Sequence, residues 1–203
     1  MRLLLPLLLV GCARAESETD PGTSVGNPNM TRVALTVVEE GDWRHDVAEF
    51  PIRGVGLVSC ERYREIWTLD QRVDLLGGTL VDPPLGAWCR QTWHPGGNVL
   101  IEGTLDDRPY RFELALGPIE LEGTWEVEEE DRFIMEFGAL GWLEAFRDRI
   151  TSGEGVDVGP EDPLHDRIAT AFKSGIGIYR DRDGDGVLSP EERRRWRLVS
   201  PVR

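Results

Sequence analysis

Residues 99–116 read V-L-I-E-G-T-L-D-D-R-P-Y-R-F-E-L-A-L, and this stretch indicates the fold more clearly than any other part of the chain. From Tyr110 to Leu116, apolar residues alternate with others, as they do when one face of an extended strand is buried. Residues 105–109, L-D-D-R-P, are typical of a turn. The stretch therefore predicts a β-hairpin with strands over 99–104 and 110–116 and one face in the protein core.

Shorter runs of the same kind lie on both sides of this hairpin. They cover 33–37, 52–58, 66–69, 73–76, 87–93, 119–127 and 133–137, and turn-forming Gly and Pro residues separate many of them. Several short strands with frequent turns predict an antiparallel sandwich or barrel. We expect a mainly β fold in which residues 31–150 form an antiparallel β-sandwich.

The hydrophobic period changes after residue 140. Apolar residues recur there at helical spacing in two sets, which are Leu143, Phe146 and Ile150, and then Leu164, Ile168 and Phe172. This spacing predicts two short helices, and the Gly-containing stretch 153–160 between them predicts a linker. We expect residues 151–203 to form this linker and a metal-binding segment.

Residues 181–192, D-R-D-G-D-G-V-L-S-P-E-E, suit a hard divalent cation. The candidate ligands are the carboxylates of Asp181, Asp183 and Asp185, the backbone carbonyl of Val187, the hydroxyl of Ser189 or a water bound to it, and the bidentate carboxylate of Glu192. Gly186 stands where such a loop turns sharply. The stretch resembles the calcium loop of the EF-hand family at every position, which implies Ca²⁺ as the cofactor. The alternative is an acidic surface turn, because Asp and Gly also favour turns without metal.

The two arms of this loop differ in character. Residues 189–192, S-P-E-E, form a capping box with Pro at the first helical position, which predicts an exiting helix through Trp196. Before the loop, Ile176, Ile178 and Tyr179 stand among glycines, so the entering arm is either a broken helix or a strand. The sequence contains no second D-x-D-x-D-G. We expect an EF-hand-like helix-loop-helix whose arms pack on the sheet or on another copy of the chain.

The first residues predict an exported, membrane-anchored protein. Arg2 precedes an apolar run over 3–10, which is too short to span a bilayer and is typical of a secretory signal over 1–11. Residues 9–12, L-V-G-C, resemble the lipobox of bacterial lipoproteins, which implies lipidation of Cys12 and anchoring in the cell envelope. The Ala13 that follows implies outer-membrane delivery. The inward or outward orientation stays open.

Composition supports this location. Residues 12–30 are rich in polar residues, Pro and Gly, which predicts a disordered tether. The central chain, through 73–76 and 103–112, also resembles uncharacterised extracytoplasmic β-sandwich domains of bacterial lipoproteins. Cys60 and Cys89 form either a disulfide in an oxidising compartment or two reduced core thiols, and we expect the disulfide. The net charge of −14 argues against a nucleic-acid partner, which requires a basic surface.

No residue pattern predicts catalysis. His45, His94 and His165 lie far apart and match no metal-ligand or nucleophile-base motif. We therefore expect a binding or structural protein with a possible envelope-protein or glycan partner. The alternative function is a carbohydrate-binding or adhesion module, in which Trp43, Trp88 and Trp93 form a platform for sugar rings. Core packing is the competing interpretation for these Trp residues.

A basic cluster ends this acidic chain. It comprises Arg180, Arg182, Arg193, Arg194, Arg195, Arg197 and Arg203. Three interpretations stay open: contact with anionic lipid head groups, contact with the acidic body of the same chain, or a solvated helix face.

Overall fold

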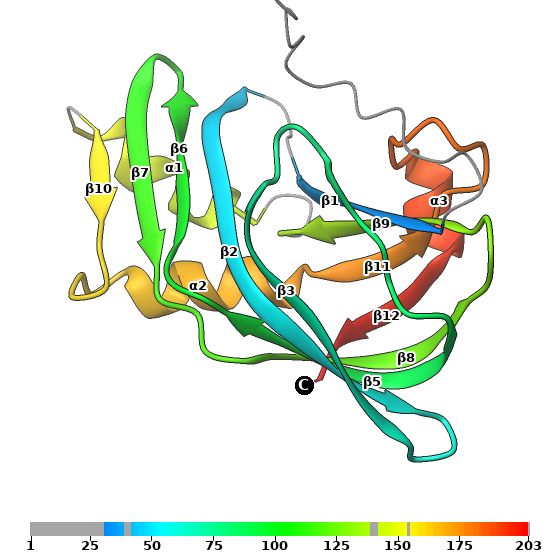
Figure 1. Ribbon diagram of the computed structural model, residues 1–203. Helices are drawn as coiled ribbons and strands as arrows, with labels where there is room; N and C mark the ends of the chain where they lie inside the picture. Colours follow the sequence, from blue (N-terminus) through cyan, green and yellow to red (C-terminus); the bar gives the residue numbers. More distant parts are fainter. Residues whose placement is uncertain (1–30, 39–41, 139–141, 154, 203) are drawn as a thin grey trace, which may run out of the picture.

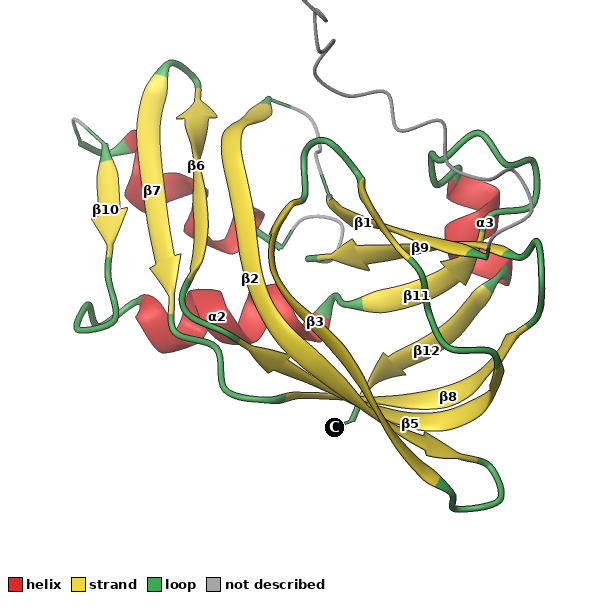
Figure 2. Cartoon of the chain, viewed as in Figure 1, coloured by secondary structure: helices red, strands yellow, loops and turns green. Residues whose placement is uncertain are grey.

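The computed structural model describes residues 31–38, 42–138, 142–153 and 155–202. In this part of the chain the fold is mainly β, as the alternating sequence pattern predicts (Figures 1 and 2). Hydrogen bonds join twelve strands into one curled sheet, in the order β10-β7-β6-β2-β5-β8-β12-β11-β9-β1-β4, with β3 paired to β2 outside this path.

The predicted hairpin is confirmed as β6 (Val99–Leu105) and β7 (Arg108–Leu114). Its turn is shorter than the five residues expected, because only Asp106 and Asp107 lie between the paired residues Leu105 and Arg108. Both have positive φ angles, 49° and 61°, which match the tight two-residue turns that follow the twist of antiparallel strands.

The long strand β2 (Trp43–Ser59) is the centre of this half of the sheet. Its first part pairs with β6, and its second part lies between β5 (Gly86–Pro95) and β3 (Arg64–Asp74), all antiparallel. A disulfide between Cys60 and Cys89 joins the end of β2 to β5, with the two Cα atoms 4.9 Å apart.

The sheet is mixed rather than antiparallel throughout. β1 (Arg32–Val37) pairs in parallel with β9 (Arg132–Phe137), and the short β10 (Val156–Val158) pairs in parallel with β7. The expectation of an antiparallel fold was wrong for these two pairs. Strands far apart in sequence can meet in either direction, and alternation within one strand carries no information on that direction.

The last part of the chain completes this sheet. β11 (Gly177–Arg180) lies between β9 and β12 (Arg197–Pro201), and β12 in turn pairs with β8 (Ile119–Val127). β4 (Thr79–Val81) forms the edge beside β1. Residues 151–203, expected to be a linker and metal-binding segment, thus supply three strands to the same sheet as residues 31–150.

Few helices accompany the sheet in the described residues. They are η1 (Glu144–Phe146), α1 (Arg147–Thr151), α2 (His165–Ser174) and α3 (Pro190–Arg195). The helices predicted around Phe146 and Phe172 are therefore confirmed, and both of these side chains are buried. Phe172 on α2 stacks on Phe137 of β9 with ring centres 5.9 Å apart, which fixes α2 against the core.

The predicted export signal over 1–11, the lipidation site Cys12 and the tether over 12–30 lie outside the described residues. Among the residues that the structure does describe, no helix is long and apolar enough to cross a membrane.

Candidate metal centre

The acidic loop over 181–192 connects β11 to α3, so its entering arm is a strand and the predicted helix-loop-helix is a strand-loop-helix. Ile178 pairs with Met135 of β9 on one side and Val199 of β12 on the other. Gly177 has no room for a side chain, since a Cβ atom there would lie 2.9 Å from Arg197 Nε and 3.0 Å from the Tyr179 ring. β-branched residues and this packing favour the extended arm over a helix.

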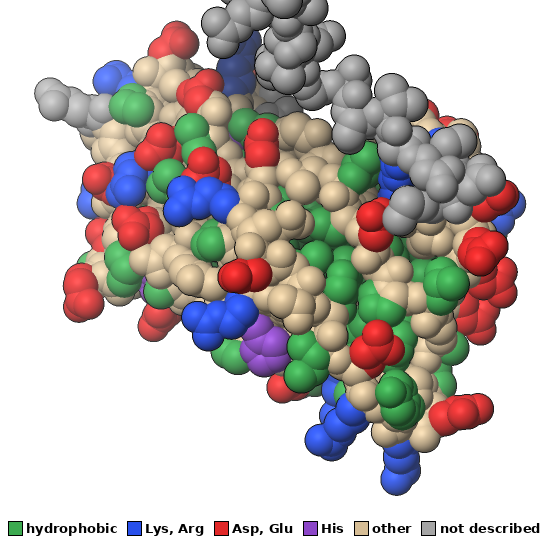
Figure 3. Space-filling model, viewed as in Figure 1, with side chains coloured by type: hydrophobic (Ala, Val, Ile, Leu, Met, Phe, Trp, Pro, Cys, Tyr) green, Lys and Arg blue, Asp and Glu red, His purple; other side chains and the backbone are tan. Residues whose placement is uncertain are grey.

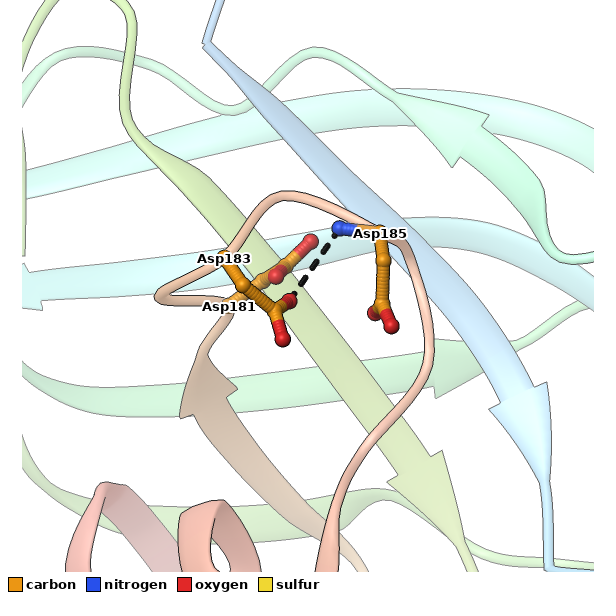
Figure 4. A group of neighbouring side chains, drawn as sticks. All are labelled: Asp181, Asp183 and Asp185. Carbon is orange, nitrogen blue, oxygen red and sulfur yellow. Dashed lines mark hydrogen bonds between the residues drawn. The ribbon is translucent and has the colours of Figure 1, made fainter.

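Three of the predicted ligands lie together in this loop. One carboxylate oxygen from each of Asp181, Asp183 and Asp185 falls within 4.8 Å of the others, and Figure 4 shows the three side chains gathered on the concave side of the turn. Asp181 is half-buried, whereas Asp183 and Asp185 are exposed. Three carboxylates at such short separation repel one another unless a cation lies between or beside them.

Backbone amides hold each carboxylate in place. Asp181 accepts hydrogen bonds from Gly184 N at 2.7 Å and Gly186 N at 3.1 Å, and Asp183 accepts one from Asp185 N at 3.3 Å. Asp185 accepts another from Val187 N at 2.8 Å. Gly186 has a φ angle of 78°, which other residues adopt at a cost, so the predicted sharp turn is present at this residue.

The exiting arm begins as the sequence predicts. Ser189 caps α3 by accepting from Glu192 N at 3.2 Å, while the Glu192 carboxylate accepts from Ser189 N at 3.0 Å, which is a complete capping box. Glu192 also accepts from Arg182 N at 2.9 Å and from the Ser189 hydroxyl at 2.8 Å. The hydrogen bonds from the Arg182 and Ser189 backbone, then from the Ser189 hydroxyl, lower the pKa of Glu192, so this carboxylate is held ionised.

Five of the six predicted ligands therefore fall into two groups, and Val187 belongs to neither. The three Asp residues form the cluster, whereas Ser189 and Glu192 bond to each other and to the two ends of the loop. The Val187 side chain is 66% exposed, and its N–H donates to Asp185. The donor set is all oxygen and includes several carboxylates, which fits the hard cation Ca²⁺ in type, although Glu192 would have to give up capping contacts to become a bidentate ligand.

The loop packs on the outer face of the sheet. Leu188, buried within the loop, contacts a small apolar cluster with Ala34, Ile134 and Tyr179. These three residues are register neighbours across β1, β9 and β11. The neighbouring β9 residues Phe133 and Met135 belong instead to the main core, so Ile134 points to the opposite face. The sheet thus supports the loop from one side.

Two polar contacts strengthen this attachment. Arg193 of α3 bonds to Glu136 of β9 through both Nε and Nη2, with the shortest contact at 2.6 Å. Arg132, also from β9, donates from Nη1 to the carbonyl of Gly184 at 2.8 Å, and its own carbonyl accepts from Asp181 N at 3.0 Å. Arg193 belongs to the basic cluster noted in the sequence, whereas Arg132 and Glu136 were not predicted to support the loop. Glu136 is a lone charge in the apolar run F-I-M-E-F, and this pattern could have indicated a role for it.

The candidate sugar platform is not at the surface. Trp43, Trp88 and Trp93 are only 7%, 3% and 0% exposed and belong to the main core. Core packing is therefore the correct interpretation of all three, and the carbohydrate-binding alternative loses the feature on which it was based.

The histidines do not form a common site among the described residues. His45 contacts the Tyr110 hydroxyl at 2.6 Å and the Val38 carbonyl at 3.2 Å, and it is buried. His165 is also buried and accepts from Ala115 N at 3.0 Å. His94 lies on β5 with an exposed side chain. The two buried histidines thus have clear structural contacts.

Several of the C-terminal arginines make contacts within the described residues, and Arg203 lies outside those residues. Arg180 pairs with Asp131, Arg193 with Glu136 and Arg195 with Glu191. Arg182 lies over the Trp196 ring at 4.4 Å. On the face seen in Figure 3, acidic and basic side chains are interspersed. These contacts favour the interpretation that the cluster interacts largely with its own chain.

Comparisons of the chain with models of protein families, with curated proteins and with solved structures found no match.

Proposed function

We propose that this chain is a calcium-binding lipoprotein of the bacterial cell envelope, in which the ion stabilises the fold and the protein acts by binding or as a structural component. The observation that carries the calcium proposal is the meeting of the Asp181, Asp183 and Asp185 carboxylates in a turn whose spacing resembles an EF-hand loop. A bound dication would remove the repulsion among these groups.

A structural role follows from where the loop is attached. The loop joins β11 to α3, and α3 leads directly into β12. An ordered loop would therefore stabilise the positions of β11 and β12 inside the sheet. Extracellular calcium modules bind with dissociation constants of about 10⁻⁴ to 10⁻³ M, and such sites stay filled where calcium is plentiful. We therefore propose stabilisation rather than signalling as the role of the ion.

The envelope location is based on sequence alone. The lipobox-like residues 9–12 support anchoring through Cys12, preferably in the outer membrane. The disulfide between Cys60 and Cys89 is compatible with an oxidising compartment. A direct test is metabolic labelling with a fatty acid in the native host, where the wild-type chain should carry label and Cys12→Ala should not.

Calcium titration tests the metal proposal. We expect amide NMR shifts confined largely to 181–192 and one bound ion per chain by calorimetry. Asp181→Ala should abolish calcium binding, and Glu192→Gln should weaken it. Asp166→Ala removes a carboxylate on α2, away from the loop, and should leave calcium binding unchanged. Identical spectra of the wild type in chelator and in excess Ca²⁺ would contradict the proposal.

A further inference from the structure

A cleft separate from the acidic loop lies where the end of α2 meets β8 and the end of β12. Its volume is about 860 Å³, and residues of the helix and of both strands line it, among them Ile119, Lys173 and Arg197. Small-molecule sites in proteins have volumes of about 300 to 1,000 Å³. The cleft is therefore large enough for a small ligand.

Arg197 is fixed in this cleft by the protein itself. Its Nη2 donates to the Ile176 carbonyl at 2.7 Å, its Nε donates to the Val199 carbonyl at 3.3 Å, and its guanidinium lies 5.9 Å from the Tyr179 ring centre. A guanidinium has five N–H donors, so these two bonds leave further donors for a ligand. Because its position is already set, binding an anion there costs little additional side-chain entropy.

Neither cation of the cleft has an acidic partner within the described residues. Arg197 bonds only to carbonyls, and Lys173 makes no ion pair. The chain has 37 acidic residues against 23 Lys and Arg, so carboxylates are abundant as partners for its cations. Two unpaired cations beside one cleft are therefore the charge arrangement expected at a site for an external anion.

The cleft formed by β6, β7 and β10 provides a comparison within the same molecule. There the acidic residues Asp46, Glu102 and Asp157 outnumber Arg111, and Arg111 pairs with Glu102, Glu113 and Asp157. Of the described residues that line the cleft at α2, Glu120 is the single acidic one, beside Lys173 and Arg197. The balance of charge thus favours an anionic group in one cleft and not in the other.

We propose that the cleft beside α2 binds a small amino acid, whose carboxylate contacts Arg197 and Lys173. Glu120 supplies a carboxylate for the ammonium group of the same ligand, and the hydroxyls of Ser174 and Ser200 provide further hydrogen bonds. Ile119 adds an apolar surface for an aliphatic side chain. This proposal does not depend on calcium binding.

Lys173 is the single lysine of the sequence, which gives a specific probe. After ¹³C-methylation of the full chain, its ε-amine gives one side-chain NMR resonance distinct from that of the terminal amine. The ligands to compare are L-leucine, N-acetyl-L-leucine, which lacks the ammonium group, and L-leucinamide, which lacks the carboxylate. We expect leucine to shift the Lys173 resonance saturably and each analogue to bind about tenfold more weakly, because each loses one charge-assisted contact.

Variants separate this site from general charge effects. The substitutions Arg197→Gln and Lys173→Gln should each weaken leucine binding by about tenfold. Calorimetry and the amide resonance of Ser200 measure leucine binding in both variants. Arg195→Gln removes the same charge on α3 and should leave binding unchanged. Lys173→Gln keeps the test valid if Arg197→Gln does not fold, because the Lys173 side chain has no hydrogen bond or ion pair with any residue that the structure describes. Absence of leucine binding, equal binding of leucinamide or N-acetyl-leucine, or full binding by Lys173→Gln would each overturn the proposal.

Discussion

Glu136 on β9 and Arg193 on α3 form a two-pronged ion pair across the outer face of the sheet, with Arg193 Nη2 2.6 Å from one carboxylate oxygen and Nε 3.0 Å from the other. The Glu136 side chain is 6% exposed and that of Arg193 25% exposed. Such a pair fixes the helix that follows the acidic loop, because a carboxylate this deeply buried requires a cation beside it.

Removing the guanidinium of Arg193 should therefore lower the stability of the protein. We expect Arg193→Ala to lower the free energy of unfolding by about 2 kcal/mol, at or below the lower limit for buried pairs because Arg193 is partly solvated. Arg194→Ala removes the neighbouring, exposed arginine and should change stability by less than about 0.5 kcal/mol. Urea unfolding of the two variants measures the difference, and equal stabilities would show that the ion pair does not hold α3.

The apolar contact between Leu188 and the sheet can be tested against a control substitution at the adjacent residue, Val187. Leu188→Ala should destabilise the protein by about 2 kcal/mol and weaken calcium binding, since its side chain packs against Ala34, Ile134 and Tyr179. Val187→Ala changes the adjacent, 66% exposed side chain and should affect neither property. Thermal unfolding with and without Ca²⁺ gives both quantities. If the two variants behave alike, the sheet does not support the loop.

Glu192 caps α3 and is also a proposed calcium ligand, and the capping role can be measured in the absence of calcium. In calcium-free protein, Glu192→Ala should lower stability by about 1 kcal/mol or more, because it removes hydrogen bonds to Arg182, Ser189 and the start of α3. Asp183→Ala changes an exposed candidate ligand and should be neutral or stabilising without calcium, yet reduce any stabilisation that calcium gives. Chemical denaturation of both variants, in chelator and in excess Ca²⁺, measures these two effects on stability. Equal effects of the two substitutions in chelator would rule out the separate capping role.

The disulfide should stabilise the half of the sheet around β2. Cys60 and Cys89 are 29 residues apart, and closing a loop of this length removes entropy from the unfolded chain worth about 3.6 kcal/mol. Replacing both by Ser should therefore lower the melting temperature, and a reducing agent should lower that of the wild type but not that of the variant. A wild type insensitive to reduction under unfolding conditions would contradict this expectation.

Local patterns in the sequence predicted local structure. The alternation after Tyr110 indicated the β6–β7 hairpin, the spacing of Leu164, Ile168 and Phe172 indicated α2, and the residues from Ser189 to Glu192 indicated the start of α3. In each case the determining contacts lie within a few residues of one another.

The features that the sequence did not reveal depend on distant partners. β12 was not predicted as a strand, because it is held by β8 and β11 rather than by its own alternation. The parallel pairing of β1 with β9 joins residues about 100 positions apart, such as Val33 and Phe133. The sequence left the entering arm of the loop open as a broken helix or a strand. Pairing with β9 and β12 decides for the strand, and this pairing cannot be seen in the local sequence.

The position of β12 has a consequence for the continuity of the sheet. This strand, Arg197–Pro201, enters the sheet between β8 and β11, which come from separate regions of the chain. In the sheet order, β8 and β11 have no pairing with each other, and β12 alone joins them. Removing this strand would leave an unpaired edge on each of its neighbours and divide the sheet into two separate parts.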